Sequence, residues 1–329
     1  MSNLKSPVLA TVVFITVLAC SWSLDARAQG KEIDFNANWK FKEFDDPAHS
    51  RGDYDDSDWR ALKVPHDYIY ENGVSKDGSQ QQFGGYHGGG IAWYRKHFSL
   101  DDIEAGRTHL EFDGVYMNSE VWVNGHYLGG RPYGYISFRF DITDQLRDGN
   151  NVISVRVDNE KQPSARWYHP GGIYAPVRLI RTEPTHIQFN SLFVKTPTAS
   201  EAGAALDISF SLEGTVGQGD KFAAQIKLVD ESGNVVATAS QKVENEKVKI
   251  VGVAIESPRL WSPDTPYLYD LEVSLLEDDE PVDAIQTKIG IRHIRWDTDT
   301  GFWLNGKNVK LQGVSEHYEG GPVGGAWTK

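Results

Sequence analysis

The chain has 329 residues, a formal net charge of -13 and a single cysteine, Cys20. An acidic surface repels a phosphate backbone, so the charge argues against a nucleic-acid-binding protein. This length predicts two or three domains rather than one, and a lone cysteine excludes an internal disulfide.

Residues 1–28 carry the pattern of an export signal. Lys5 precedes an apolar run that is too short to span a bilayer, and 26–28 (ARA) supplies small residues for a cleavage site. We therefore expect no transmembrane segment and an exported protein, periplasmic or extracellular. The alternative is a lipoprotein anchored at Cys20, because 17–20 (VLAC) resembles a bacterial lipoprotein box.

The stretch 31–183 has the pattern of a two-sheet β sandwich. Short apolar runs are broken by Gly, Asn and Asp, without a sustained helical period. The stretch 120–128 alternates on both sides of Asn124-Gly125, which is typical of a two-residue hairpin, and 152–157 is a further half-buried strand. We predict a two-sheet jelly-roll β-sandwich.

A second series of short strands follows over 184–290. Strands are expected at 206–210 and 224–229, and a turn at 231–234 leads into another strand at 235–237. About one hundred residues of this kind, without a cysteine pair, predict an immunoglobulin-like β-sandwich that lacks the disulfide.

The remaining stretch, 291–329, predicts the start of a different architecture. Asn305-Gly306 between two apolar runs indicates a hairpin, and 309–314 is a short apolar strand that leads to a Gly-rich segment with His317. Each strand of a (β/α)8 barrel delivers polar residues to the active face in this way. The fold class predicted is thus all-β: a jelly roll, an immunoglobulin-like sandwich and the first strand of an incomplete (β/α)8 barrel.

Several segments together resemble family 2 glycoside hydrolases, most of all the β-galactosidase branch. In chain order they are 54–60 (YDDSDWR), 64–68 (VPHDY), 90–96 (GIAWYRK), 121–125 (VWVNG), 164–168 (SARWY), 172–174 (GIY), 260–263 (LWSP), 266–269 (PYLY) and 301–317. They cover nearly all of the chain after residue 28, and the resemblance implies that the jelly roll at 31–183 is a domain of the sugar-binding type. Two positions depart from the family pattern: Tyr68 stands where Trp is usual, and 175–176 (AP) stands where an arginine is usual.

The resemblance implies a retaining β-glycosidase that hydrolyses terminal β-galactosides of a β-linked oligo- or polysaccharide in carbohydrate breakdown, without a cofactor. Such enzymes use two carboxylates about 5–5.5 Å apart, a nucleophile and an acid/base. In this family both are glutamates on later barrel strands, so we expect them beyond Lys329 and expect the 329-residue chain to be inactive alone. Glu316 and Glu319 are interpreted as polar loop residues.

The resemblance also implies substrate-binding residues within the chain. His317 matches a family histidine in the sugar pocket, and Arg166 and Trp167 lie on a loop that reaches the barrel mouth. Well-known members carry an acidic residue about where Arg166 stands, and an arginine offers only donors. The alternatives are a structural loop histidine for His317 and an interdomain salt bridge for Arg166.

Two further features are interpreted as structural. His66 and Asp67 have no nucleophile at suitable spacing, so we expect a turn whose side chains satisfy local backbone groups. The ten histidines are scattered without the spacing of a zinc site, and we expect no metal.

Two other functions remain open. One is a non-catalytic carbohydrate-binding or scaffold fragment made of the two sandwiches, although 309–314 would then be an unpaired apolar strand. The other is a β-glucuronidase or β-mannosidase of the same family; those branches match 65–67 (PHD) less well.

Overall fold

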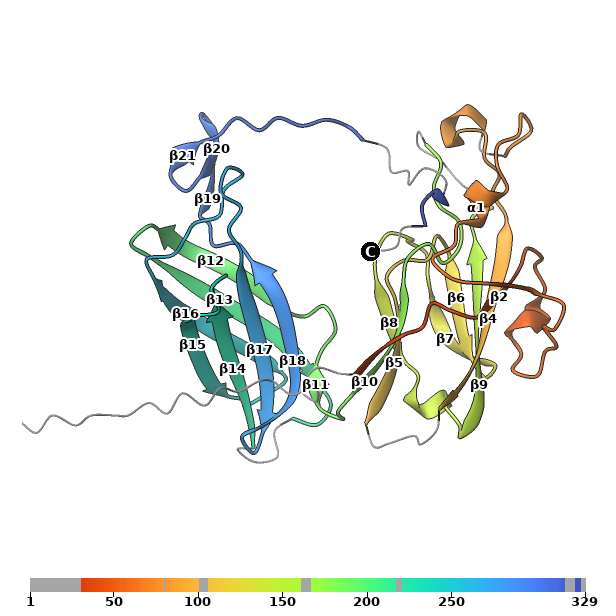
Figure 1. Ribbon diagram of the computed structural model, residues 1–329, viewed down its shortest axis with the longest axis horizontal. Coiled ribbons are helices and arrows are strands. Elements are labelled where there is room, and N and C mark those ends of the chain that lie inside the picture. Colours follow the sequence, from red (N-terminus) through yellow and green to blue (C-terminus); the bar gives the residue numbers. More distant parts are fainter. Residues whose placement is uncertain are drawn as a thin grey trace, which may run out of the picture.

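The computed structural model describes residues 31–79, 81–100, 106–160, 167–216, 221–316 and 323–326. These residues form two β sandwiches and a small three-stranded sheet (Figure 1). The α-helix of the described chain is a single turn, α1 (Tyr68–Glu71). The predicted all-β class is confirmed, while the expected export signal at 1–28 and Cys20 lie outside the described residues.

The first sandwich consists of two antiparallel sheets. Their strand orders are β1-β10-β5-β8 and β3-β2-β4-β9-β6-β7. The strands are β1 (Lys31–Asp34), β2 (Trp39–Lys42), β3 (Arg60–Leu62), β4 (Ile91–Leu100), β5 (Arg107–Phe112), β6 (Ser119–Val123), β7 (His126–Arg131), β8 (Phe138–Asp141), β9 (Gly149–Asp158) and β10 (Val177–Thr182). Short 3-10 helices lie in the loops: η1 (Pro47–Ser50), η2 (Gln81–Gly84) and η3 (Thr143–Gln145).

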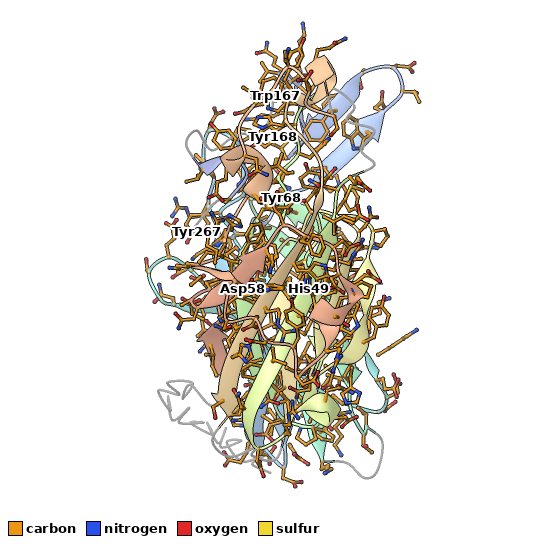
Figure 2. All side chains as sticks on the ribbon, turned by 90° about the vertical axis from the view of Figure 1, so that its right-hand side faces the viewer. His49, Asp58, Tyr68, Trp167, Tyr168 and Tyr267 are labelled. Atoms are coloured by element: carbon orange, nitrogen blue, oxygen red, sulfur yellow. The ribbon has the colours of Figure 1, made fainter. Side chains whose placement is uncertain are left out.

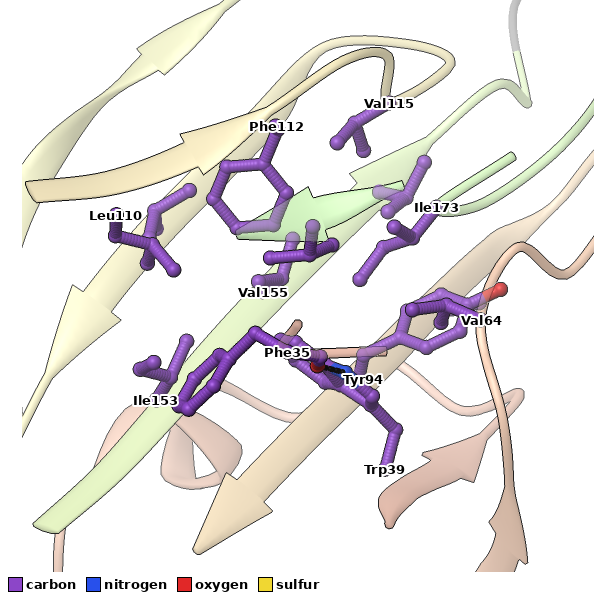
Figure 3. Packing of buried hydrophobic residues seen from close by; sticks show 14 of the residues in the cluster. Phe35, Trp39, Val64, Tyr94, Leu110, Phe112, Val115, Ile153, Val155 and Ile173 are labelled. Atoms are coloured by element: carbon purple, nitrogen blue, oxygen red, sulfur yellow. Dashed lines mark hydrogen bonds between the residues drawn. The ribbon is translucent and has the colours of Figure 1, made fainter. Parts of the chain in front are cut away.

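The core of this jelly roll lies between the two sheets (Figure 3). Trp39, Tyr94 and Phe112 are completely buried in it. The indole nitrogen of Trp39 also donates a hydrogen bond of 2.8 Å to the carbonyl of Phe35, so its single polar atom is satisfied. Truncating a buried aromatic side chain of this kind costs about 3–5 kcal/mol.

On the outer face of the larger sheet, one arginine is fully buried. Arg95, fully buried on β4, donates from Nε to Asp56 at 2.7 Å and from a terminal nitrogen to Ser154 Oγ at 2.8 Å. Burial opposes ionisation of Asp56, but hydrogen bonds from Arg95, His97 and Lys40 lower its pKa to about 2. This charged cluster attaches the loop between β2 and β3 to the sheet.

The second sandwich is also built from two antiparallel sheets. One has the order β11-β13-β12 with β16 beside β13, and the other has the order β15-β14-β17-β18. The strands are β11 (His186–Ile187), β12 (Phe193–Ser200), β13 (Gly203–Glu213), β14 (Phe222–Val229), β15 (Val235–Lys242), β16 (Lys247–Glu256), β17 (Tyr269–Glu277) and β18 (Glu280–Ile289).

Apolar burial holds this immunoglobulin-like unit together. Residues alternate between buried and partly exposed along β13 and β14, as strands with one face in a core require. Leu206, Ile226 and Leu228 are completely buried, and the sequence holds no cysteine besides Cys20. The strands predicted here from alternation are confirmed, and their stability does not depend on a disulfide.

Both Asn-Gly hairpins predicted from the sequence are confirmed. Asn124 and Gly125 join β6 to β7 with φ angles of 52° and 85°. Asn305 and Gly306 join β20 (Gly301–Leu304) to β21 (Lys307–Asn308) with φ angles of 49° and 77°. Positive φ at both central positions is the geometry that an Asn-Gly turn supplies most readily. The third sheet is completed by β19 (Ile294–Asp297).

The strand predicted at 309–314 does not form. The structure has no strand between Asn308 and residue 316, and Leu311 and Val314 are 61% and 93% exposed. A strand exists only where a neighbouring backbone accepts and donates its hydrogen bonds. Apart from the bond from the N–H of Val309 to the carbonyl of Phe302, no described strand pairs with this segment. The apolar pattern is present in the sequence, but a strand also requires a pairing partner.

Candidate functional site

In the loop that is predicted to face the substrate, the described residues begin at Trp167. Figure 2 shows Trp167 and Tyr168 together at one end of the jelly roll. Trp167 is half-buried against the jelly-roll core and meets the ring of Tyr168 edge-on at 6.5 Å between centroids. The other two predicted site residues, Arg166 and His317, lie outside the described residues.

A group of packed aromatic rings contacts the start of this loop. The ring centroids of His87 and Tyr168 are 4.8 Å apart, and Tyr70 on α1 lies 5.7 Å from His87 and 5.8 Å from Tyr168. His87 is buried and its Nδ1 donates to the carbonyl of Ile69 at 3.2 Å. The start of the loop is therefore fixed to α1 by ring packing.

A second group of aromatic residues, next to the loop, is partly exposed to solvent. His169 stacks on Tyr116 at 5.1 Å with the rings 14° apart, and its Nδ1 is hydrogen-bonded to the hydroxyl of Tyr135. Burial lowers the pKa of His169, which keeps its imidazole neutral at physiological pH. Tyr135 and Tyr133 are 40% and 58% exposed. Exposed aromatic faces with hydroxyl groups at their rims suit contacts with a sugar ring, which presents both C–H and O–H groups.

The buried carboxylate of Asp67 connects the segments of this region. Its Oδ1 accepts hydrogen bonds from the N–H of Gly171 at 2.9 Å and from the N–H of Tyr70 at 3.2 Å, which caps α1. Its Oδ2 accepts from the N–H of Gly325 at 2.8 Å. Burial raises the pKa of Asp67, while these three backbone donors favour its charged form.

His66 belongs to a different network. Its Nδ1 lies 2.8 Å from the hydroxyl of Tyr94 and its Nε2 lies 2.6 Å from Glu71. The adjacent guanidinium of Arg60 forms an ion pair with Glu71 and lowers its pKa to about 2. The expectation that His66 and Asp67 satisfy local backbone groups is confirmed for Asp67 by its bond from the N–H of Tyr70, while Gly171 and Gly325 are distant in the sequence. His66 contacts side chains instead.

The sequence did not reveal the contact between Asp67 and Gly325, which are separated by 258 positions. The available signal was the Gly324-Gly325 pair, since adjacent glycines indicate close backbone approach. Among the described residues, no group of three or more His, Cys, Asp or Glu side chains is arranged to hold a metal ion. No helix in that part of the chain has the length and apolar character needed to cross a membrane.

Two family models match the chain in succession. The model for the sugar binding domain of glycosyl hydrolases family 2 matches residues 33–182, and the model for glycosyl hydrolases family 2 matches residues 185–292. These two matches correspond to the two sandwiches of the structure.

Curated relatives extend the likeness along the chain. A protein of Formosa agariphila named putative beta-glucuronidase is 47% identical over the whole chain, which covers 31% of that relative. A beta-galactosidase of Bacteroides ovatus is 40% identical over 94% of the chain, covering 37% of that relative. The chain thus spans about a third of the length of these curated relatives.

Solved structures share this fold over most of the chain. A beta-glycosidase from Bacteroides vulgatus matches with a TM-score of 0.85 and 34% identity, over 91% of this chain and 39% of that one. A family 2 glycosyl hydrolase from Bacteroides cellulosilyticus matches with a TM-score of 0.83 and 36% identity, over 90% of this chain and 40% of that one. The chain therefore belongs to glycosyl hydrolase family 2.

Proposed function

We propose that this chain supplies the jelly-roll and immunoglobulin-like portions of a retaining β-glycosidase that removes terminal sugars from β-linked glycans. The observation that carries the proposal is the meeting of 167–172 with 323–326 at Asp67. From the family resemblance we expect a substrate contact at Trp167, on the first of these segments, and another at His317, shortly before the second in the sequence. Their meeting supports a substrate site shared between the jelly roll and the chain that follows 309–316.

The chemistry proposed for the complete protein divides between its parts. Cleavage requires two carboxylates about 5–5.5 Å apart, which we expect outside this chain. The chain's own contribution is sugar positioning: Arg166 and His317 are proposed to hydrogen-bond sugar hydroxyls, beside Trp167 and the aromatic surface around His169. Such contacts increase the rate when they strengthen in the transition state.

Two sugars are supported by specific observations. The motif pattern and the 40% identical beta-galactosidase favour a β-galactoside. The 47% identical putative beta-glucuronidase favours a β-glucuronide, and so does the charge of Arg166, because a guanidinium matches a carboxylate in both charge and geometry. A neutral galactoside offers Arg166 only hydroxyl acceptors.

The test uses the protein encoded by the full gene, assayed on nitrophenyl β-galactoside, β-glucuronide and β-mannoside. Arg166→Ala should lower kcat/KM on the preferred substrate by roughly ten- to a hundredfold, with the melting temperature nearly unchanged. On a glucuronide, Arg166→Lys should restore part of the loss, because it restores the charge without the bidentate geometry. Arg51→Ala, an exposed arginine paired with Asp53, is the matched control.

Three outcomes would contradict the proposal. Absence of turnover on all three substrates would remove the β-glycosidase assignment for these sugars. A melting temperature lowered by several degrees with kcat/KM intact would make Arg166 an interdomain tie. An equal loss in Arg51→Ala would show that the effect is not local to the site.

A further inference from the structure

We propose that the jelly roll carries a docking slot, formed by Asp67, Tyr70 and Pro170, that binds the backbone of Gly324-Gly325. The slot holds the segment 323–326 against the loop that begins at Trp167. Asp67 is then a positioning residue rather than a substrate ligand. The slot itself stands on geometry, and only its effect on catalysis rests on the proposed function.

The two oxygens of Asp67 serve different segments. Oδ1 is occupied by the N–H groups of Tyr70 and Gly171, both within the jelly roll. Oδ2 accepts from Gly325, which lies far away in the sequence. Capping α1 and holding Gly171 requires only Oδ1, so the second oxygen has a separate task. If any one of these three N–H donors is lost, the buried carboxylate keeps a negative charge that is less well stabilised.

The slot requires residues without side chains. A Cβ on Gly324 would lie 2.5 Å from the Cβ of Tyr70, and Gly324 has a φ of 58°. A Cβ on Gly325 would lie 2.4 Å from the Cβ of Pro170, whose ring cannot rotate away. Both glycines are buried, while Val323 before them is exposed. Only a glycine pair therefore reaches the carboxylate by this path.

The same carboxylate also fixes the loop. Gly171 and Pro170 follow Trp167 and His169 directly, and a Cβ on Gly171 would meet Ile69 at 2.2 Å. The loop and the glycine pair thus share one anchor and cannot shift independently. In the sequence, Arg166 lies five positions before Gly171 and His317 lies eight positions before Gly325.

The first experiment needs no enzymatic activity. Hydrogen exchange followed by mass spectrometry on the 329-residue protein should show protection at Gly325, and Gly325→Ala should make exchange there roughly tenfold faster or more. Gly313→Ala is the matched control, because a Cβ at Gly313 meets no atom within 4 Å. Asp67→Asn keeps the shape of the side chain but turns one acceptor into a donor, and should give the same loss at Gly325.

A double-variant cycle separates docking from local stability. If Asp67 and Gly325 act through each other, the exchange rate of Asp67→Asn with Gly325→Ala should be about that of either single variant. Additive effects, or wild-type exchange as fast as that of an unprotected peptide, would overturn the slot. A Gly325→Ala protein that exchanges like the wild type would overturn it as well.

The second experiment links the slot to catalysis in the protein encoded by the full gene. Gly325→Ala should raise KM several-fold more than it lowers kcat, because it displaces binding contacts without touching the catalytic carboxylates. Loss of protection with unchanged KM would refute the positioning role and leave the slot intact. Loss of protection in a protein without turnover on any tested sugar would refute the proposed function and not the slot.

Discussion

The imidazole of His109, on β5 of the jelly roll, lies 5.1 Å from the imidazole of His186, on β11 of the second sandwich. Both rings are 2% exposed. His109 Nε2 lies 3.2 Å from the hydroxyl of Thr182, and His186 Nδ1 donates to the carbonyl of Glu183. The two sandwiches therefore meet through a pair of buried rings tied to the linker that joins them.

This pairing predicts a stability that depends on pH. Burial is the main reason that the pKa of His109 is lowered to about 4; the charges of Arg139, His186 and Arg107 contribute in the same direction, and Asp141 opposes them. The unfolded chain binds a proton near pH 6.5 and the folded chain does not, so stability is full above that pH and falls as pH drops toward 4. The loss expected over this window is on the order of 3 kcal/mol.

Urea denaturation between pH 7.5 and pH 4 measures this loss. His109→Gln cannot titrate, so its stability should vary less over the window than that of the wild-type protein. His126→Gln, an exposed histidine after the β6–β7 turn, should retain the wild-type pH dependence. An unchanged slope in His109→Gln would assign the effect to other groups.

The Arg95 cluster predicts a large effect from a small change. Asp56→Asn removes the charge that balances a fully buried guanidinium, and breaking a buried pair in this way costs about 3–5 kcal/mol. Asp58→Asn, which affects the largely exposed pair with Lys42, should cost no more than about 1 kcal/mol. Thermal melting of both variants distinguishes them, and similar melting temperatures would contradict the role given to Asp56.

The stability of the second sandwich should be unaffected by reducing agents but lowered by a cavity in its core. Leu228→Ala on β14 leaves a void in a core without disulfides and should cost about 2–5 kcal/mol. Leu268→Ala, at a side chain 36% exposed, should cost far less. Excess dithiothreitol should change neither melting temperature, and a shift on reduction would point to a disulfide between two chains through Cys20, the single cysteine of the sequence.

Activity of the 329-residue protein is expected to be absent. The nucleophile and the acid/base are expected beyond Lys329, and positioning residues cannot replace them. Nitrophenyl glycoside assays on the purified chain measure this directly. Turnover well above a blank would mean that catalytic groups lie within the chain.

Export is proposed to remove the first 28 residues. Cleavage after Ala28 leaves Gln29 at the N-terminus and a protein without cysteine, as the small residues at 26–28 indicate. The intact mass of the exported form tests this. A diacylglyceryl group on Cys20 would establish the lipoprotein alternative instead.

Local signals accounted for much of this fold. The turns at Asn124 and Asn305 were predictable because an Asn-Gly pair specifies its own backbone geometry. The strands of the second sandwich were predictable because alternation marks a strand with one buried face. In both cases the information lies within about ten adjacent residues.

Relations between distant segments were not predictable in the same way. The strand expected at 309–314 depends on neighbours that its own pattern cannot supply. The hydrogen bond from Gly325 to Asp67 depends on two loops meeting in space, and neither loop's sequence specifies the other. Of the predicted site residues, only Trp167 lies in the described chain, so the roles of Arg166 and His317 stay predictions.

The linker between the two sandwiches is only three residues long, from the end of β10 at Thr182 to the start of β11 at His186. Fully extended, it spans roughly 14 Å between these two Cα atoms. Because the linker is so short, each domain is held at a very high effective concentration next to the other domain. Contacts as modest as Arg139 over the ring of Phe189 can then keep two domains docked that would separate as free molecules. Cutting the linker should therefore weaken their association far more than removing any one of those contacts.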